Sequence, residues 1–358
     1  MDDNPNIKRI VQHFGAGVGK TDDSHLLQGV VPGMTTVIEH EGRGYAPRPT
    51  TTPPTFQRKK TPERIPRSRM VWKVETEFPH RYVTSLASYN GMLYAATATT
   101  GVICRKNGIT WEESFDSGEQ SIESLAVYQN VLYAGSSYNG KIFAYTAASG
   151  WFLHATLGTG VESISALYVY DDVLYAGTYY QGKVFAYNGT SWNLVYESGH
   201  SAIRSFAEYN GNLYAGSYFW SADEAKIFVF NGSTWQLSIT TPRTAINALG
   251  TYGGILYAGG YGGIAGNILY VYNGSTWAEE EMSGIITSGI SAFGIFQNAL
   301  YVGGEDIYRR GDAWRTVYTS PVASIYTLIS FKNRFYAGGG NYASGTDATV
   351  FVQRRQFY

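Results

Sequence analysis

The sequence predicts an all-β fold, a seven-bladed β-propeller with four-stranded blades, and three observations carry this prediction. A Leu-Tyr-Ala-Gly motif or a close variant recurs seven times, at intervals of 35–44 residues. An apolar residue precedes each motif tyrosine by eight positions, and a tryptophan follows six of the seven copies. Repeats of about 40 residues with four short strands are typical of propellers. The motif tyrosines are Tyr94, Tyr133, Tyr175, Tyr214, Tyr257, Tyr301 and Tyr336.

Each repeat is expected to contain four antiparallel strands. An Asn-Gly turn joins the first two strands, as at Asn90-Gly91 and Asn210-Gly211, because this dipeptide supplies the positive φ angles of a two-residue hairpin. A third run such as Lys141–Tyr145 and a fourth run that bears the tryptophan follow. A small residue precedes each apolar marker, which suits a first strand at a crowded axis.

The last blade is expected to be completed by a strand from the N-terminal side. The seventh repeat ends at Tyr358 before it reaches a tryptophan. The segment Met70–Glu75 carries Trp72 at the matching place, ahead of the first repeat. Pairing the two ends of the chain in one blade would close the ring. We therefore expect a propeller over residues 70–358 and an extended arm over residues 1–69.

The arm is predicted to be an anchor for a larger assembly. It carries 11 Lys/Arg against 7 Asp/Glu, and residues 43–69 contain six prolines. Such a stretch cannot build a core and should be extended. We expect its basic side chains to contact neighbouring structural proteins of the assembly. These side chains are Arg43, Arg48, Arg58, Lys59, Lys60, Arg64, Arg67 and Arg69.

Several other classes of protein find no support in the sequence. The single cysteine, Cys104, excludes an intramolecular disulfide framework, and no signal peptide is recognised. No stretch approaches the roughly 18 consecutive apolar residues of a membrane span. Gly15–Thr21 looks like a phosphate-binding loop, but Phe14 stands where the first glycine is required. The six histidines lack metal-ligand spacing, so we expect neither a metal nor a cofactor.

The axis of the ring offers one weak candidate site. A hydrolase of the sialidase type needs several arginines, carboxylates and a nucleophile that converge there. Only Glu123, Arg204 and Tyr326 form a defensible trio, and a solvated channel lining is the simpler interpretation. We therefore predict no catalytic residue and a chain that is not an enzyme. The seven positions expected to line the axis are Thr84, Glu123, Ser165, Arg204, Asn247, Ser291 and Tyr326.

The loops between the second and third strands form a stronger candidate for binding. They should all emerge on one face, and Trp220 is the only tryptophan outside the repeat pattern. Aromatic residues are enriched at protein interfaces, and they also stack on sugar rings. The alternative is that these aromatic loops pack on one another. The candidate residues are Tyr138, Tyr179, Tyr180, Tyr218, Phe219, Trp220, Tyr261 and Tyr342.

Three Asn-Gly sites match the N-glycosylation sequence, at Asn188, Asn231 and Asn273. Each lies where a hairpin is expected to need Asn-Gly. Turn formation accounts for them without glycosylation.

Local patterns resemble known propeller families. Leu256–Gly260, followed by Tyr270 and Trp277, resembles the Gly-Gly, Tyr, Trp pattern of kelch propellers. The turn Asn107–Trp111 looks like the Asp-box turn of sialidase-like propellers, with Lys106 in place of its Asp. The glycine- and tyrosine-rich repeat behind an arm is similar to propeller domains of structural proteins in tailed-phage virions. This resemblance implies a seven-bladed propeller in a virion.

The sequence favours a non-enzymatic structural or attachment component of a phage or other viral particle. Its propeller would bind a protein or glycan on a host surface. The alternatives are a cytoplasmic kelch-like adaptor and, third, a sialidase-like glycan hydrolase. Nucleic acid ranks below protein as a partner of the arm, because aromatic residues are sparse there and the net charge is modest.

Overall fold

The computed structural model describes residues 68–158, 160–221, 224–262, 268–282, 289–341 and 347–357. These residues form 28 β-strands and no helix, so the predicted all-β fold is confirmed. Consequently, none of the described segments is a helix long and apolar enough to cross a membrane.

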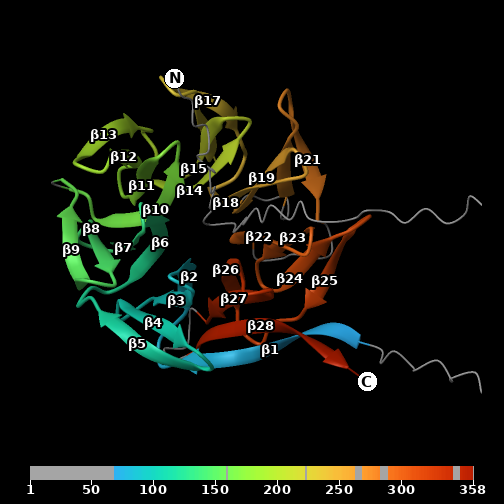
Figure 1. The fold of residues 1–358 in the computed structure, drawn as a ribbon. Coiled ribbons are helices and arrows are strands. Elements are labelled where there is room, and N and C mark those ends of the chain that lie inside the picture. The colour runs from blue at the N-terminus through green and yellow to red at the C-terminus, as the bar shows by residue number, and fades with distance from the viewer. Residues whose placement is uncertain are drawn as a thin grey trace, which may run out of the picture.

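The strands follow one another in groups of four, which we call units 1 to 7. Figure 1 shows the units around a common centre, with the first strand of each unit innermost. Unit 1 is β2 (Val83–Tyr89), β3 (Met92–Thr97), β4 (Val102–Asn107) and β5 (Thr110–Asp116); unit 2 is β6 (Ile122–Tyr128), β7 (Val131–Ser136), β8 (Lys141–Thr146) and β9 (Gly150–Thr156); unit 3 is β10 (Ser163–Tyr170), β11 (Val173–Tyr179), β12 (Lys183–Tyr187) and β13 (Trp192–Glu197); unit 4 is β14 (Ala202–Tyr209), β15 (Asn212–Tyr218), β16 (Lys226–Phe230) and β17 (Trp235–Thr240); unit 5 is β18 (Ala245–Tyr252), β19 (Ile255–Tyr261), β20 (Ile268–Tyr272) and β21 (Trp277–Glu281); unit 6 is β22 (Ala292–Phe296), β23 (Ala299–Gly303), β24 (Ile307–Arg310) and β25 (Trp314–Tyr318); unit 7 is β26 (Ser324–Phe331), β27 (Arg334–Gly340), β28 (Ala348–Phe357) and β1 (Ser68–Phe78).

Units 1, 2, 6 and 7 are separate four-stranded antiparallel sheets. Units 3, 4 and 5 join into one twelve-stranded sheet through two single residue pairs, Tyr179 with Ala202 and Tyr218 with Ala245. The units therefore touch side by side, each keeping its own hydrogen-bonded ladder. Buried apolar clusters fill the spaces between adjacent units.

The N-terminal strand β1 pairs antiparallel with the C-terminal strand β28, from Ser68 opposite Phe357 to Phe78 opposite Ala348. Figure 1 shows the two strands side by side, blue against red. The predicted segment Met70–Glu75 lies within β1, which begins two residues before the expected boundary. Arg69, predicted as part of the anchor, belongs to this strand and faces Gln356. The other seven predicted anchor residues lie outside the described residues.

The Asn-Gly turns take two forms. Asn90 and Gly91 have φ angles of 47° and 70°, as predicted for a two-residue hairpin. The turn at Asn188 differs, because only Gly189 has a positive φ, of 96°. The Asn188 side-chain oxygen instead accepts hydrogen bonds from the backbone N–H groups of Thr190 and Ser191. Asn231 and Asn273 do the same, so these three sites are Asx turns. Each joins two paired antiparallel strands, so the predicted hairpins are present, but the asparagine does not take the positive φ of a two-residue turn.

Side-chain hydroxyls on the inner strands link each unit to the next. The Thr84 hydroxyl donates to the carbonyl of Ile122, at 2.5 Å, and the Ser165 hydroxyl donates to that of Ile203, at 2.6 Å. Ser124 and Ser205 are two of the small residues predicted at the axis. Their hydroxyls donate to Ile164 and Ile246 carbonyls at 3.2 Å. The small residues therefore bind adjacent units together besides fitting a crowded centre.

A tyrosine at the end of each of the first five inner strands makes a second link between units. Its hydroxyl donates to a carbonyl in the first turn of the next unit, a contact that the sequence analysis missed. The pairs are Tyr89 with Asn130, Tyr128 with Asp172, Tyr170 with Gly211, Tyr209 with Gly254 and Tyr252 with Asn298, at 2.7–3.0 Å.

The repeated tryptophans pack against other aromatic rings. Trp192 stacks on Tyr187 with 5.1 Å between ring centroids, and Trp277 stacks on Tyr272 at 4.9 Å. Trp235 stacks on Tyr196 of the preceding unit at 5.1 Å. These tryptophans therefore pack both within a unit and between adjacent units.

Candidate functional site

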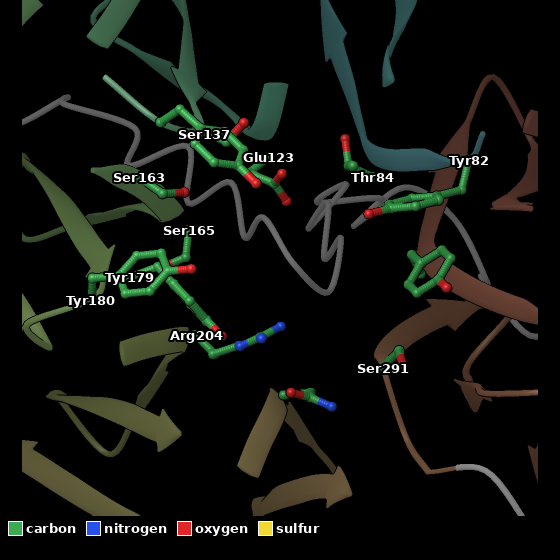
Figure 2. A pocket seen from close by; sticks show the side chains of 13 residues that line it. Tyr82, Thr84, Glu123, Ser137, Ser163, Ser165, Tyr179, Tyr180, Arg204 and Ser291 are labelled. Carbon is green, nitrogen blue, oxygen red and sulfur yellow. The ribbon is translucent and has the colours of Figure 1, made fainter. Parts of the chain in front are cut away.

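A pocket of about 470 Å³ lies at the centre around which the units are arranged (Figure 2). It contains all seven side chains that the repeat pattern placed at the axis. A smaller cavity of about 120 Å³ is lined by the same seven residues. The pocket is lined by Tyr82, Thr84, Glu123, Ser137, Tyr138, Ser163, Ser165, Tyr179, Tyr180, Arg204, Asn247, Ser291 and Tyr326.

Arg204, on β14, is held by two aromatic rings. Its guanidinium carbon lies 5.1 Å from the ring centroid of Tyr179 and 5.1 Å from that of Tyr218. The two rings stack on each other at 5.7 Å with an interplanar angle of 16°. Cations are attracted to ring faces at this distance, so the tyrosines fix the direction of the guanidinium. Figure 2 shows it pointing into the pocket.

The hydrogen-bonding capacity of Arg204 is not used up within the described part of the chain. Its Nε atom is buried without a hydrogen-bond partner there. No carboxylate of the described residues forms an ion pair with it. An atom that buried cannot be reached from the pocket, so a ligand would meet the terminal N–H groups of the guanidinium, which point into the pocket (Figure 2).

Glu123, on β6, carries the other charge of the pocket. Its carboxylate points into the same space (Figure 2) and has no ion-pair partner among the described residues. The pocket therefore presents one acceptor group and one donor group of opposite charge that do not neutralise each other by contact. Tyr326, the third residue of the predicted trio, packs against Tyr82 with 4.9 Å between ring centroids.

Two tyrosines of the lining adopt an unusual backbone conformation. Tyr138 and Tyr180 have φ angles of 74° and 65°, and their side chains are 60% and 53% exposed. Bulky residues rarely take positive φ, and such strain costs about 1–3 kcal/mol and concentrates at functional sites. The same place in the repeat, five residues after the motif tyrosine, is Gly262 in unit 5, where φ is 95°. Unit 1 has Thr99 at this place, with a φ of 78°, so the turn itself requires the positive φ and accepts residues other than glycine. What the turn does not require is an exposed aromatic ring beside the pocket, as Tyr138 and Tyr180 provide.

The predicted aromatic face divides into two parts. Tyr138, Tyr179 and Tyr180 line the pocket, and Tyr218 lies behind Arg204. Trp220 and Tyr261 are 77% and 56% exposed but are not part of the lining. Phe219 packs on His200, with ring centroids 4.7 Å apart. Tyr342 lies outside the described residues.

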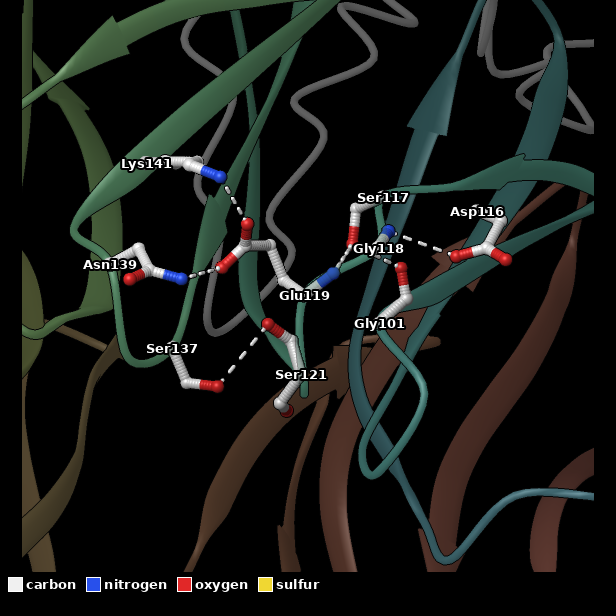
Figure 3. Close-up of polar contacts among 9 residues, drawn as sticks. All are labelled: Gly101, Asp116, Ser117, Gly118, Glu119, Ser121, Ser137, Asn139 and Lys141. Carbon is white, nitrogen blue, oxygen red and sulfur yellow. Dashed lines mark hydrogen bonds and ion pairs between the residues drawn. The ribbon is translucent and has the colours of Figure 1, made fainter.

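A buried residue fourteen positions before the motif tyrosine forms hydrogen bonds with the loop between the second and third strands of its unit. In unit 2 it is Glu119, whose carboxylate accepts from Lys141 at 2.5 Å and from Asn139 at 2.7 Å (Figure 3). These partners lie next to Tyr138. The Ser137 hydroxyl adds a bond to the carbonyl of Ser121, at 3.4 Å.

Other units use different residues at this position. His80 contacts the Thr100 hydroxyl, His200 contacts that of Ser217, and Arg243 donates to the carbonyl of Gly262. The sequence analysis missed this set because the residue types differ. The constant spacing from the motif tyrosine was the signal that could have found it.

Metal binding has no visible basis in the described ranges. No group of three or more His, Cys, Asp or Glu side chains there is placed to hold a metal ion. Cys104 is 5% exposed, and burial raises the pKa of its thiol to about 12.

Comparison with known proteins supports the fold alone. No protein-family model matches the chain, and no curated protein matches it. A streptogramin B lyase structure is similar with a TM-score of 0.63 and 10% identity, over 80% of this chain and 98% of that one. The extracellular domain of the putative hybrid two-component system BT4673 from B. thetaiotaomicron is similar with a TM-score of 0.60 and 12% identity, over 77% of this chain and 38% of that one. The computationally designed Ika8 protein has a TM-score of 0.52 and 21% identity, over 75% of this chain and 82% of that one.

These similarities give no support to the resemblance to kelch, Asp-box or phage virion propellers. At such identities the similarities show how the strands are arranged, and they do not indicate a substrate or a partner for this chain. Together with the sheets described above, they show that the chain has a β-propeller-like all-β fold.

Proposed function

We propose that this chain is a non-enzymatic attachment component of a phage or other viral particle. Residues 1–69 anchor it to neighbouring structural proteins, and the propeller displays a binding pocket toward a host surface. The observation that carries the proposal is the axial pocket with Tyr138 and Tyr180 exposed in strained conformations. The same turn is formed with threonine in unit 1 and with glycine in unit 5, so the choice of an exposed tyrosine at these two places supports a role in binding.

We further propose that the seven units are the seven blades of a closed propeller. The grouping of four strands to each sequence repeat supports this count. The pairing of β1 with β28 supports closure, since it places both ends of residues 68–357 in one sheet. A closed ring leaves only short, protected sheet edges and gives a rigid frame for the pocket.

The composition of the arm supports its role as the anchor. Residues 43–69 hold eight Lys/Arg against one Glu, and their six prolines favour an extended chain. An extended basic segment can follow an acidic surface of neighbouring subunits without a core of its own.

Density-gradient fractionation of the native source tests this proposal. The full-length chain and a chain lacking residues 1–42 should sediment with particles, because both keep the basic stretch 43–69. A chain lacking residues 1–69 should stay at the top of the gradient. If all three chains stay at the top, the particle assignment fails, and a soluble adaptor with a one-to-one protein partner replaces it.

An enzyme that cleaves glycans is the second candidate, favoured by the presence of Glu123 and Arg204 in one pocket. Carboxylates are the usual acid, base or nucleophile in glycoside hydrolysis, and most glycoside hydrolases use a pair of them. Glu123 is the only carboxylate among the lining residues named above. The purified chain and Glu123→Gln should therefore show equal, background rates on a glycan panel. Turnover that Glu123→Gln abolishes would establish the enzyme instead.

A further inference from the structure

We propose that the axial pocket binds one uncharged sugar residue at the end of a glycan chain. Glu123 accepts hydrogen bonds from sugar hydroxyls, Arg204 donates to ring or hydroxyl oxygens, and the rings of Tyr138 and Tyr180 stack on the sugar. The inference rests on the proposed display of the propeller and names the ligand class of its pocket.

The charges of the pocket favour an uncharged ligand. Glu123 and Arg204 are its two charged side chains and make no ion pair with each other. An acidic sugar would satisfy Arg204 but would bring a second negative charge into the space of Glu123. A diol satisfies both groups, because each hydroxyl can donate to a carboxylate and accept from a guanidinium.

The uncharged part of the lining is also suited to a polyol. It consists of hydroxyl and amide side chains together with tyrosine rings. Thr84 and Ser165 already donate their hydroxyl protons to backbone carbonyls, which leaves their oxygens to accept from a ligand. Asn247 adds both a donor and an acceptor. A volume of about 470 Å³ lies within the range of small-ligand pockets.

The tyrosines supply the surface on which a sugar can stack, and they connect this surface to Arg204. Tyr180 packs edge-on against Tyr179, with ring centroids 4.6 Å apart at 85°. Tyr179 in turn holds Arg204. A sugar that rests on Tyr180 therefore meets a guanidinium whose direction is already fixed, which reduces the ordering cost of binding.

The test starts with the full-length chain on an array of printed glycans with neutral or acidic terminal residues. The tightest neutral glycan is then titrated against the wild type, Glu123→Gln, Arg204→Met and Tyr180→Gly. Tyr261→Ala is the matched control, because Tyr261 is an exposed tyrosine outside the pocket lining. Thermal unfolding of every variant is recorded alongside.

Wild type should prefer neutral termini, and each of the three pocket variants should bind at least about tenfold more weakly. Tyr180→Gly should bind the glycan more weakly but keep or raise the unfolding temperature, because glycine takes the positive φ without strain. If Tyr180 were only structural, the variant would have a lower unfolding temperature and unchanged binding. Tyr261→Ala should bind like the wild type. Preference for acidic termini, no binding to any neutral glycan, or unchanged binding by Glu123→Gln and Tyr180→Gly would overturn the inference. Sedimentation with particles is measured separately, so anchored display can stand even if the sugar assignment fails.

Discussion

Glu75, on β1, forms an ion pair with Lys106, on β4, and the two side chains are only 5% and 6% exposed. Glu75 also pairs with Arg354 on β28. One carboxylate therefore joins the N-terminal strand to unit 1 and to the C-terminal strand. Burial alone would raise the pKa of Glu75, but the hydrogen bonds and charges of Lys106 and Arg354 hold it below its ordinary value.

Replacing Glu75 by glutamine should destabilise the fold strongly. Lys106 would remain buried without its partner, and breaking a buried ion pair in this way costs about 3–5 kcal/mol. Urea denaturation followed by tryptophan fluorescence measures the loss. Glu112→Gln is the control, because its pair with Arg105 is much more exposed, with side chains 41% and 28% accessible, and should cost less than about 1 kcal/mol. Equal, small losses in the two variants would show that the buried pair contributes little to holding β1 against unit 1.

The tyrosine hydroxyls between units should each contribute measurably to stability. Tyr128→Phe removes the bond to the carbonyl of Asp172, at 2.9 Å, and should cost about 1 kcal/mol. A phenylalanine ring should fit at this position, because Phe296 and Phe331 occupy the equivalent places in units 6 and 7. The substitution therefore removes only the hydroxyl. A denaturation midpoint equal to that of the wild type would contradict a role for the hydroxyl.

The repeat allowed much of the frame and the identity of the axial residues to be predicted. The spacing of the motif predicts the order of the strands. The Asn90-Gly91 dipeptide predicts a hairpin turn, because both residues readily take the positive φ that the turn requires. Because every inner strand repeats the same alternation, the seven axial positions followed from register alone. The structure brings them together in one pocket.

The chemistry of the site could not be predicted in the same way. The orientation of Arg204 depends on Tyr179 and Tyr218, which come from different units. The positive φ angles of Tyr138 and Tyr180 break the usual preference for glycine, so propensity gives no warning of them. Contacts between repeats and strained positions have no local signature, and such departures from local rules are where function is expected.

Acid should destabilise the fold through His200. Its pKa is lowered to about 4, first by burial and then by the charge of Lys226, while Glu224 acts weakly in the other direction. The unfolded chain, with an ordinary histidine pKa near 6.5, binds the proton more readily between these values. Stability should therefore fall as the pH falls from about 6.5 to about 4, by at most about 1.4 kcal/mol per pH unit for this group.

His200→Asn isolates this contribution. The variant keeps a polar side chain near Ser217 and loses the titration, so its unfolding temperature should fall less over the same pH interval. Protonation of Glu75 affects stability at a lower pH. Because the pKa of this carboxylate is lowered in the fold, its contribution to stability is lost only as the pH falls below about 4.5. Identical pH profiles for His200→Asn and the wild type would rule out His200 as the source of the acid sensitivity.

Cys104 can report the release of β1 from unit 1. Its thiol lies in β4 within an apolar cluster that includes Phe78 of β1 and Val350 of β28. Burial raises its pKa to about 12, so both access and thiolate formation are suppressed in the fold. A thiol reagent should therefore react quickly only after the cluster around Cys104 has opened. Since opening must precede reaction, the labelling rate in buffer measures the opening equilibrium.

Glu75→Gln should accelerate this labelling by about 100-fold or more, because a loss of about 3 kcal/mol shifts the opening equilibrium by two decades. Glu112→Gln should leave the rate nearly unchanged, although Glu112 lies on the neighbouring strand β5. Acceleration in both variants would mean that Cys104 is exposed by fraying of unit 1 itself. Acceleration in Glu75→Gln alone would identify the buried pair of Glu75 and Lys106 as the contact that keeps the N-terminal strand in place.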